Sequence, residues 1–139
     1  MNLEYKMKIE VAHLAIDNEK FLDVLQHEGA VAIITLAPVP TAVTNTWMSY
    51  LRLDKANDKI YIPAAGMHSV EEVVAQDNHL KLTMGSKEVE GTVGPGAGFH
   101  VTGTGKFIDN GPVFDQMKAD FPWVTRVLEI SVTDISQKI

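Results

Sequence analysis

The chain contains no cysteine in its 139 residues. Disulfide bonds, thiolate catalysis and iron–sulfur ligation are therefore excluded, and a reducing compartment is permitted. Arginine is also scarce, since Arg52 and Arg126 are the only two, and the lysines are scattered along a chain whose formal net charge is -6. No basic stripe could neutralise a phosphate backbone, so nucleic acid is not an expected partner.

Long apolar runs are missing as well. The longest, Ala30 to Val39, is interrupted by Thr35 and Pro38 and is far shorter than the ~20 residues that cross a bilayer. Met1 to Glu10 mixes charged and apolar residues and lacks the apolar core of a secretion signal. We therefore expect a cytoplasmic protein without a membrane partner.

The composition, 45% hydrophobic and 22% charged, is that of a globular protein. We expect one domain over 1–139, with 1–16 as an N-terminal extension of unclear role. Apolar runs and alternating patterns predict six strands. These strands are 30–36, 44–53, 59–63, 79–85, 101–108 and 127–132. Because strands and helices do not alternate regularly, a mainly β fold with short helices and an antiparallel barrel is predicted.

Three short helices are expected between these strands. The first runs from Asp17 to Gly29, with Asp17 or Asn18 as its cap and Gly29 as the left-handed residue after it. Ser69 and Glu72 have the spacing of a capping box and predict a second helix just after residue 68. An Asn-Gly-Pro sequence at 110–112 opens the third.

Two glycine-rich segments resemble nucleotide motifs only superficially. Gly94 to Gly98 predicts a tight, exposed loop, because a strand follows it where a dinucleotide fingerprint needs a helix. Gly103 to Lys106 is followed by Phe107, where a phosphate loop needs Ser or Thr to bind magnesium. The histidines are too dispersed to predict a metal site. They are His13, His27, His68, His79 and His100.

Three features are candidates for ligand contacts. Trp47 and Tyr50 are three residues apart on an expected strand, so they should point to opposite faces, and at most one should line a planar pocket. Trp123 follows Pro122 in a turn, where a partly exposed ring suits an interface or a ring-stacking wall. The helix start at Ser69 could hold a phosphate. The alternatives are that the aromatics are core residues and that the helix start binds nothing.

Four segments together resemble one known family. They are Val43 to Leu51 (VTNTWMSYL), Pro63 to His68 (PAAGMH), Thr83 to Ser86 (TMGS) and Gly94 to Phe99 (GPGAGF). These segments occur in the same order and at nearly the same spacing in small FMN-binding proteins of the pyridoxamine 5'-phosphate oxidase-like split-barrel superfamily. The chain resembles these proteins from roughly Glu19 to the C-terminus. The resemblance implies a six-stranded antiparallel split β-barrel that forms a homodimer with FMN at the subunit interface.

The resemblance also implies roles for individual residues. Asn45 and Thr46 would contact the phosphate–ribitol end or the flavin edge, and Trp47 and Tyr50 would surround the ring. The backbone near Ala64 would follow the polar edge of the flavin. This cofactor-binding segment consists of Ala64, Ala65, Gly66, Met67, His68 and Ser69.

Residues more distant in sequence are assigned by the same resemblance. Trp123 and the terminal Ile139 would approach the ring from the partner subunit, and Glu28 would place a negative charge near the flavin, which disfavours the anionic reduced form. The family pattern continues after Gly-Met-His with Lys-Thr, whereas this chain has Ser69-Val70. Loss of a charge-assisted hydrogen bond of roughly 1.5 to 3 kcal/mol would weaken FMN binding tenfold or more. Groups that could compensate are Ser69, the helix terminus and the more distant Arg52, Lys81 or Lys87.

Three functions follow from these observations. The first is an FMN-binding redox protein, either an electron carrier or a flavin-dependent oxidoreductase, with an unknown redox partner or substrate and no side chain that can be named as catalytic. The second is a module that sequesters FMN or a related phosphorylated ligand without turnover. The third is an apo homologue in which Ser69-Val70 marks a degraded phosphate site.

Overall fold

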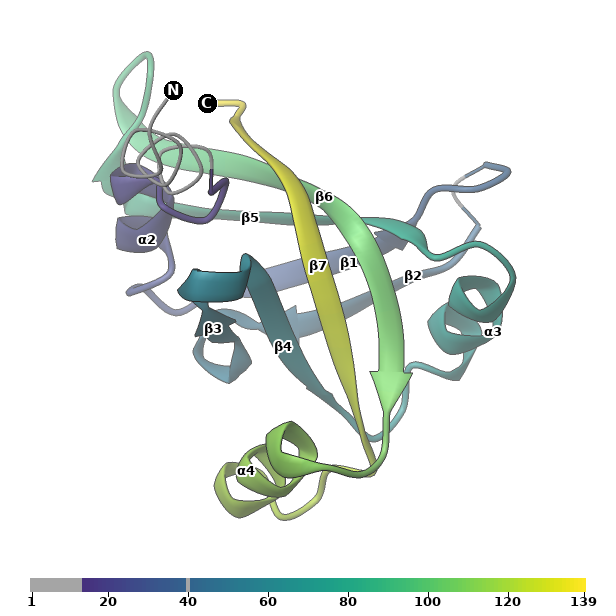
Figure 1. The fold of residues 1–139 in the computed structure, drawn as a ribbon. Helices are drawn as coiled ribbons and strands as arrows, with labels where there is room; N and C mark the ends of the chain where they lie inside the picture. The colour runs from purple at the N-terminus through teal and green to yellow at the C-terminus, as the bar shows by residue number, and fades with distance from the viewer. Residues whose placement is uncertain (1–13, 40) are drawn as a thin grey trace, which may run out of the picture.

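The computed structural model describes residues 14–39 and 41–139. Within them, seven strands form one antiparallel sheet, and short helices cover its ends and open side (Figure 1). The strands are β1 Ala30–Thr35, β2 Val43–Trp47, β3 Arg52–Asp54, β4 Lys59–Ala64, β5 His79–Glu90, β6 Pro95–Ile108 and β7 Arg126–Gln137. The helices are α2 Glu19–Val24, α3 His68–Gln76 and α4 Pro112–Asp120, with single 3₁₀ turns at Met48–Tyr50 and Lys55–Asn57.

The strand order is β2-β1-β5-β6-β7-β4-β3, so β2 and β3 form the two edges of the sheet. Only residues 48–51 separate these edges along the chain. The sheet must therefore curl until its edges approach each other, which produces a half-barrel. The prediction of a mainly β, antiparallel barrel with short helices is confirmed.

The prediction of six strands was wrong by one, because the expected strand 44–53 is divided by the 3₁₀ turn Met48–Tyr50. The N–H of Met48 donates to the carbonyl of Gly29 at 2.8 Å, and the Met48 side chain is buried in the core. These contacts turn the chain out of β2 and carry it across the opening to β3.

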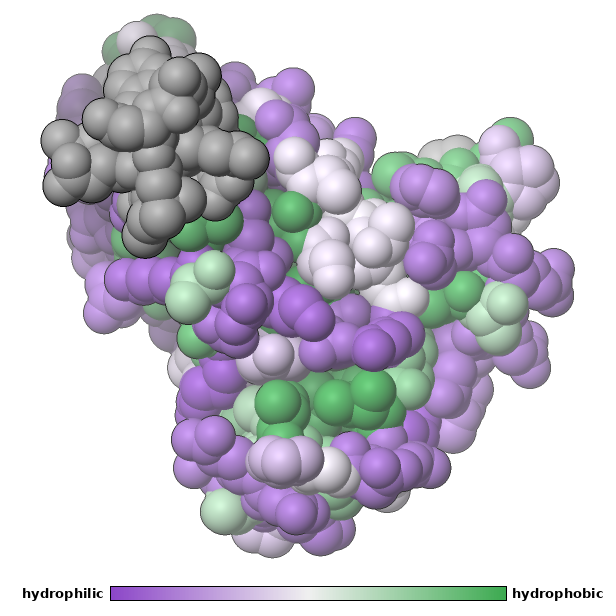
Figure 2. Space-filling view, in the orientation of Figure 1, coloured by the Kyte–Doolittle hydropathy of each residue, from purple (hydrophilic) through white to green (hydrophobic). Residues whose placement is uncertain are grey.

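The core fills the inside of the curled sheet. Its largest fully buried side chains include Phe21 of α2 and Phe99 of β6, whose rings meet edge to face at 5.6 Å. A second cluster lies against α4 and reaches the surface as an apolar patch ringed by hydrophilic residues in Figure 2. Its members are Met117, Phe121, Val124 and Val127, with Tyr50, Tyr61, Ile108, Val113 and Phe114 packed around them.

Helix α2 is shorter than predicted. Asn18 caps it as expected, because its Oδ1 accepts from the N–H of Phe21 at 3.0 Å, but the helix ends at Val24. Gly29 does not adopt the left-handed conformation. Instead, its N–H donates to Glu28 and its carbonyl accepts from Met48, so Gly29 belongs to the approach to β1.

Helix α3 begins one residue earlier than predicted, at His68. Met67 precedes it in the left-handed region, with φ 66°, and no side chain caps the helix. Ser69 is therefore inside the first turn, and the capping-box prediction was wrong. The backbone fixes this start, since the carbonyl of Met67 accepts from the N–H of Glu71 at 2.9 Å.

The glycine-rich segment 94–98 was predicted to be a tight, exposed loop, and this was wrong for all of it except Gly94, whose carbonyl accepts from the N–H of Gly91 at 2.7 Å. Strand β6 begins at Pro95, and Ala97 and Gly98 are buried. The register pairs Gly98 with Gly85 of β5. A Cβ on Gly98 would lie 2.8 Å from Cγ1 of Ile139, so the missing side chain lets the C-terminus pack across β6.

Most of the N-terminal extension lies outside the described residues. Its last part packs onto the barrel, because the N–H groups of Ala15 and Ile16 donate to the carboxylate of Asp58 at 3.0 and 2.8 Å. Ile16 is fully buried. Across residues 14–39 and 41–139, no helix is long and apolar enough to cross a membrane, and no group of three potential metal ligands is found.

Candidate functional site

A groove of about 260 Å³ lies beside edge strand β2. Three parts of the chain converge on it: β2 with the turn after it, the segment between β4 and α3, and the turn after α4. The lining residues are Thr44, Asn45, Thr46, Trp47, Tyr50, Pro63, Ala65, Gly66, Met67 and Trp123. Eight of these are predicted cofactor-binding residues, brought together from three distant segments.

Trp47 and Tyr50 line the same groove, and the prediction that they face opposite sides was wrong. The alternation of a strand stops at Trp47, and the 3₁₀ turn that follows rotates Tyr50 back toward the groove. Tyr50 then packs against Trp123 and Phe121, with ring centroids 5.6 and 5.2 Å away. The result is an aromatic wall that is anchored on the second hydrophobic cluster.

Both tryptophans of the chain line this groove. Trp47 is 50% exposed and Trp123 is 45% exposed, so large parts of both rings are available to a ligand. Trp123, which was expected to approach the ring from the partner subunit, lines the groove of its own chain.

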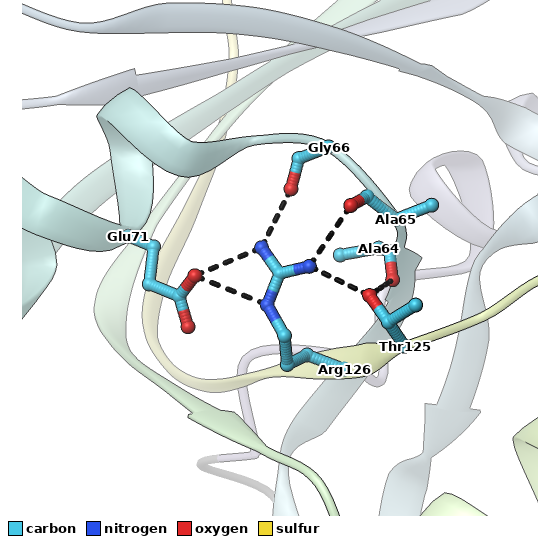
Figure 3. A network of polar contacts seen from close by, with 6 residues as sticks. All are labelled: Ala64, Ala65, Gly66, Glu71, Thr125 and Arg126. Atoms are coloured by element: carbon cyan, nitrogen blue, oxygen red, sulfur yellow. Dashed lines mark hydrogen bonds and ion pairs between the residues drawn. The ribbon is translucent and has the colours of Figure 1, made fainter.

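The segment from Ala64 to Gly66 is held from behind by Arg126 (Figure 3). Arg126 donates to the carbonyls of Ala65 and Gly66 at 3.0 and 2.6 Å, and its Nε donates to Glu71 at 3.0 Å. Sequence reasoning missed Arg126, because a single arginine at the start of a strand reads as a surface residue. The pairing of Ala64 with Arg126 between β4 and β7 brings it to this place.

Five predicted residues do not line the groove. Ala64 is buried behind it, and His68 and Ser69 are exposed on the first turn of α3, next to Met67. Ile139 lies in a separate shallow hollow of about 420 Å³ on the outer face of the sheet. Glu28 lies in a third hollow, with Lys87. Asn45 is shared by the groove and the hollow of Ile139.

The charge of Glu28 is fixed by local hydrogen bonds. The Ser49 hydroxyl and then the Ser49 N–H, both of which donate to this carboxylate, lower the pKa of Glu28 below its ordinary value. Glu28 thereby ties the approach to β1 to the 3₁₀ turn that carries Tyr50. His100 lies in the same hollow as Ile139, and burial, followed by the charges of Lys81 and Lys138, lowers the pKa of His100.

The groove is lined by no lysine or arginine side chain from the described residues. Arg52, which could have compensated for the missing family lysine, lies in a different hollow and contacts Asp120 at 3.3 Å. Lys87 lies beside Glu28, and Lys81 lies near His100. Val70 is buried in the core, so among the two departing residues only Ser69 can face a ligand.

The chain was compared with known proteins. It is 40% identical over 119 residues to the FMN-binding protein of Nitratidesulfovibrio vulgaris (strain DSM 19637 / Miyazaki F), a match that covers 86% of this chain and 96% of that protein. The chain belongs to this FMN-binding protein family. No family model matches it, so membership rests on the relative alone.

Solved structures with low sequence identity support the fold of this FMN-binding protein family member. An FMN-binding protein from Syntrophomonas wolfei subsp. wolfei has a TM-score of 0.64 at 14% identity, covering 98% of this chain and 93% of its own. A candidate pyridoxamine 5'-phosphate oxidase from Listeria innocua has a TM-score of 0.59 at 12% identity, covering 87% and 95%. The half-barrel fold of this chain is therefore shared with both of these proteins.

A larger hollow, with a volume of about 590 Å³, lies elsewhere, between β3, β4 and α4. It contains none of the residues that the family resemblance assigns to the cofactor. Its lining contains charges of both signs, from Arg52 and Lys55 and from Asp54 and Asp120. The smaller groove is the better candidate, because exposed aromatic rings and backbone donors converge there.

Proposed function

We propose that the chain binds FMN in the groove beside β2 and acts as a redox protein, either an electron carrier or a flavin-dependent oxidoreductase. The observation that carries this proposal is the convergence of Trp47, Tyr50 and Trp123 with the backbone of Gly66 and Met67 in one groove. Aromatic faces suit a planar ring, and backbone donors suit its polar edge. Bound FMN would supply one- or two-electron transfer, while the chain positions the ring and tunes its potential.

Each lining group has a proposed task. Asn45 and Thr46 of β2 would contact the ribitol and the flavin edge, since they lie at an unpaired sheet edge beside the aromatic rings. The phosphate would lie at the first turn of α3, near Ser69, where N–H groups without helical partners are directed outward. Glu28, held by Ser49 in the turn after β2, would set a fixed negative charge near the flavin.

The proposal includes a homodimer. The groove, at about 260 Å³, is smaller than the ~300 to 1,000 Å³ that enclose most bound small molecules. Trp47, Trp123 and Ile139 remain 45% to 59% exposed, which leaves apolar surface for a second copy to cover. Sedimentation equilibrium is expected to give a mass of two chains with FMN present. A monomeric FMN complex would contradict the dimer.

Binding can be followed through the protein's own fluorescence. Because both tryptophans line the groove, FMN titration is expected to quench most of the tryptophan emission with a stoichiometry of one FMN per chain. Riboflavin is expected to bind nearly as well as FMN, within about tenfold, because no cationic side chain lines the groove. An unchanged emission at millimolar FMN would refute the proposed site.

Restoring the missing charge gives a further prediction. S69K is expected to raise the affinity for FMN about tenfold, because an exposed ammonium at this turn adds roughly 1.4 kcal/mol to phosphate binding. Riboflavin, which has no phosphate, should bind S69K and wild type equally. The matched control is Q76K, which adds the same charge at the other end of α3. Equal gains in S69K and Q76K would place the phosphate elsewhere.

The redox role has its own test. The flavin of the complex is expected to bleach under a chemical reductant and to recover its colour in air while it stays bound. Bleaching by a reduced nicotinamide would favour an oxidoreductase over a carrier. Failure of every chemical and biological donor to reduce the bound flavin would contradict both redox roles and favour sequestration.

A further inference from the structure

Every nitrogen of the Arg126 guanidinium makes a polar contact within the protein. Nε and Nη2 contact the same oxygen of Glu71 at 3.0 and 2.8 Å. Nη1 donates to the carbonyl of Ala65 at 3.0 Å and to the Thr125 hydroxyl at 2.7 Å. Nη2 also donates to the carbonyl of Gly66 at 2.6 Å. A guanidinium has five N–H groups; four of them donate hydrogen bonds here, and Nη2 also forms the ion pair with Glu71.

These contacts fix the direction of three successive carbonyls. Ala64 accepts from the N–H and the hydroxyl of Thr125 at 2.9 and 3.2 Å, and the next two carbonyls accept from Arg126. In a regular strand, the carbonyl groups of successive residues point to opposite sides, as the side chains do. Here, as Figure 3 shows, all three oxygens are turned toward Thr125 and Arg126 at the start of β7.

The N–H groups of Gly66 and Met67 lie at the end of this segment and at the start of α3. Among the described residues, neither the N–H of Gly66 nor that of Met67 donates to any acceptor. Both residues line the groove beside the aromatic rings. Successive free N–H groups form a concavity that favours acceptors and negative charge.

We infer that Arg126 is a positioning residue: together with Glu71 it turns the carbonyls of Ala65 and Gly66 away from the groove, so that an edge of N–H donors faces the ring of the bound flavin. The inference rests on the proposed function. Arg126 is suited to the task because its side chain is only 15% exposed and its guanidinium lies 5.6 Å from the ring centroid of Phe107. A lysine could not replace it, since an ammonium lacks the planar fork that reaches two carbonyls and a carboxylate at once.

The consequence is electrostatic. N–H donors fixed at the polar edge of the ring stabilise negative charge there without reorganisation. Reduced FMN carries more charge on this edge than oxidised FMN, so the donors should hold the reduced form more tightly and raise its midpoint potential.

The test compares R126M with wild type and with K106M, a control that removes a cation paired with Glu129 away from the groove. In R126M, oxidised FMN and riboflavin are expected to bind about tenfold more weakly. Reduced FMN should lose about a further tenfold, which lowers the two-electron midpoint potential by about 30 mV. K106M should match wild type in its affinity for FMN and in its midpoint potential. R126K should lower the ratio of the affinity for reduced FMN to the affinity for oxidised FMN at least threefold. If R126M does not fold, R126K provides the test.

The outcomes separate the two proposals. A wild-type potential in R126M and R126K would overturn the positioning role while leaving FMN binding intact. A loss of affinity for FMN but not for riboflavin would place the segment at the phosphate and would also overturn it. Failure of the wild-type protein to bind FMN would overturn the proposed function and, with it, the role of Arg126.

Discussion

Replacing Gly103 with alanine is expected to destabilise the protein by about 3 kcal/mol or more, near the upper end of what overpacking costs. Gly103 is buried where β6 crosses β7, at an irregularity in the register between Thr102 and Gly103. A Cβ there would overlap the carbonyl oxygen of Ser131 and lie 3.2 Å from Cγ2 of Ile130. The obstacle is a paired backbone rather than a flexible side chain, so the strands would have to separate.

Urea unfolding followed by circular dichroism measures this effect. The matched control is G94A, because a Cβ on Gly94 would have no neighbour within 4 Å, and its stability should lie within about 0.5 kcal/mol of wild type. A G103A protein within about 1 kcal/mol of wild type would mean that β6 and β7 are farther apart than the structure places them.

Removing either tryptophan ring is expected to weaken FMN binding about 30-fold. Trp47 and Trp123 are about half exposed in the groove, so a flavin that covers the free half of one ring removes on the order of 80 to 100 Å² from water. At roughly 25 cal/mol per Å², this burial contributes about 2 kcal/mol. W47A and W123A should therefore each show this loss, while W47F and W123F should keep most of the affinity.

Flavin absorbance titration measures these affinities without relying on the tryptophans themselves. V93A is the control, because Val93 is 98% exposed in the loop between β5 and β6 and lines none of the hollows described. Wild-type affinity in both W47A and W123A would exclude the groove as the flavin site.

The β character of the fold could be predicted from local sequence, since all six expected segments contain a strand. The ends of the strands could not be predicted in this way, because they depend on pairing with neighbouring strands. Glycines weaken strand propensity, so the segment at Gly94 to Gly98 indicated a loop, yet pairing with β5 extends β6 back to Pro95. The division of 44–53 depends on a backbone hydrogen bond from Met48 to Gly29, which no local pattern encodes.

The site could be assembled in large part from the family resemblance, which named eight of the groove residues. Residue spacing alone misplaced Tyr50, because strand alternation does not apply across a 3₁₀ turn. Neither the family resemblance nor residue spacing identified Arg126. Its importance arises from pairing between β4 and β7, a contact between residues more than sixty positions apart, and from carbonyls whose direction the sequence does not reveal.

The visible spectrum of the protein purified without added flavin, followed by titration with FMN, tests the central claim most directly. Flavin absorption bands corresponding to one FMN per chain, or uptake of added FMN at micromolar concentration or below, are the predicted result. A colourless protein that takes up no FMN would contradict FMN binding and would mean that Ser69 and the start of α3 cannot hold the phosphate.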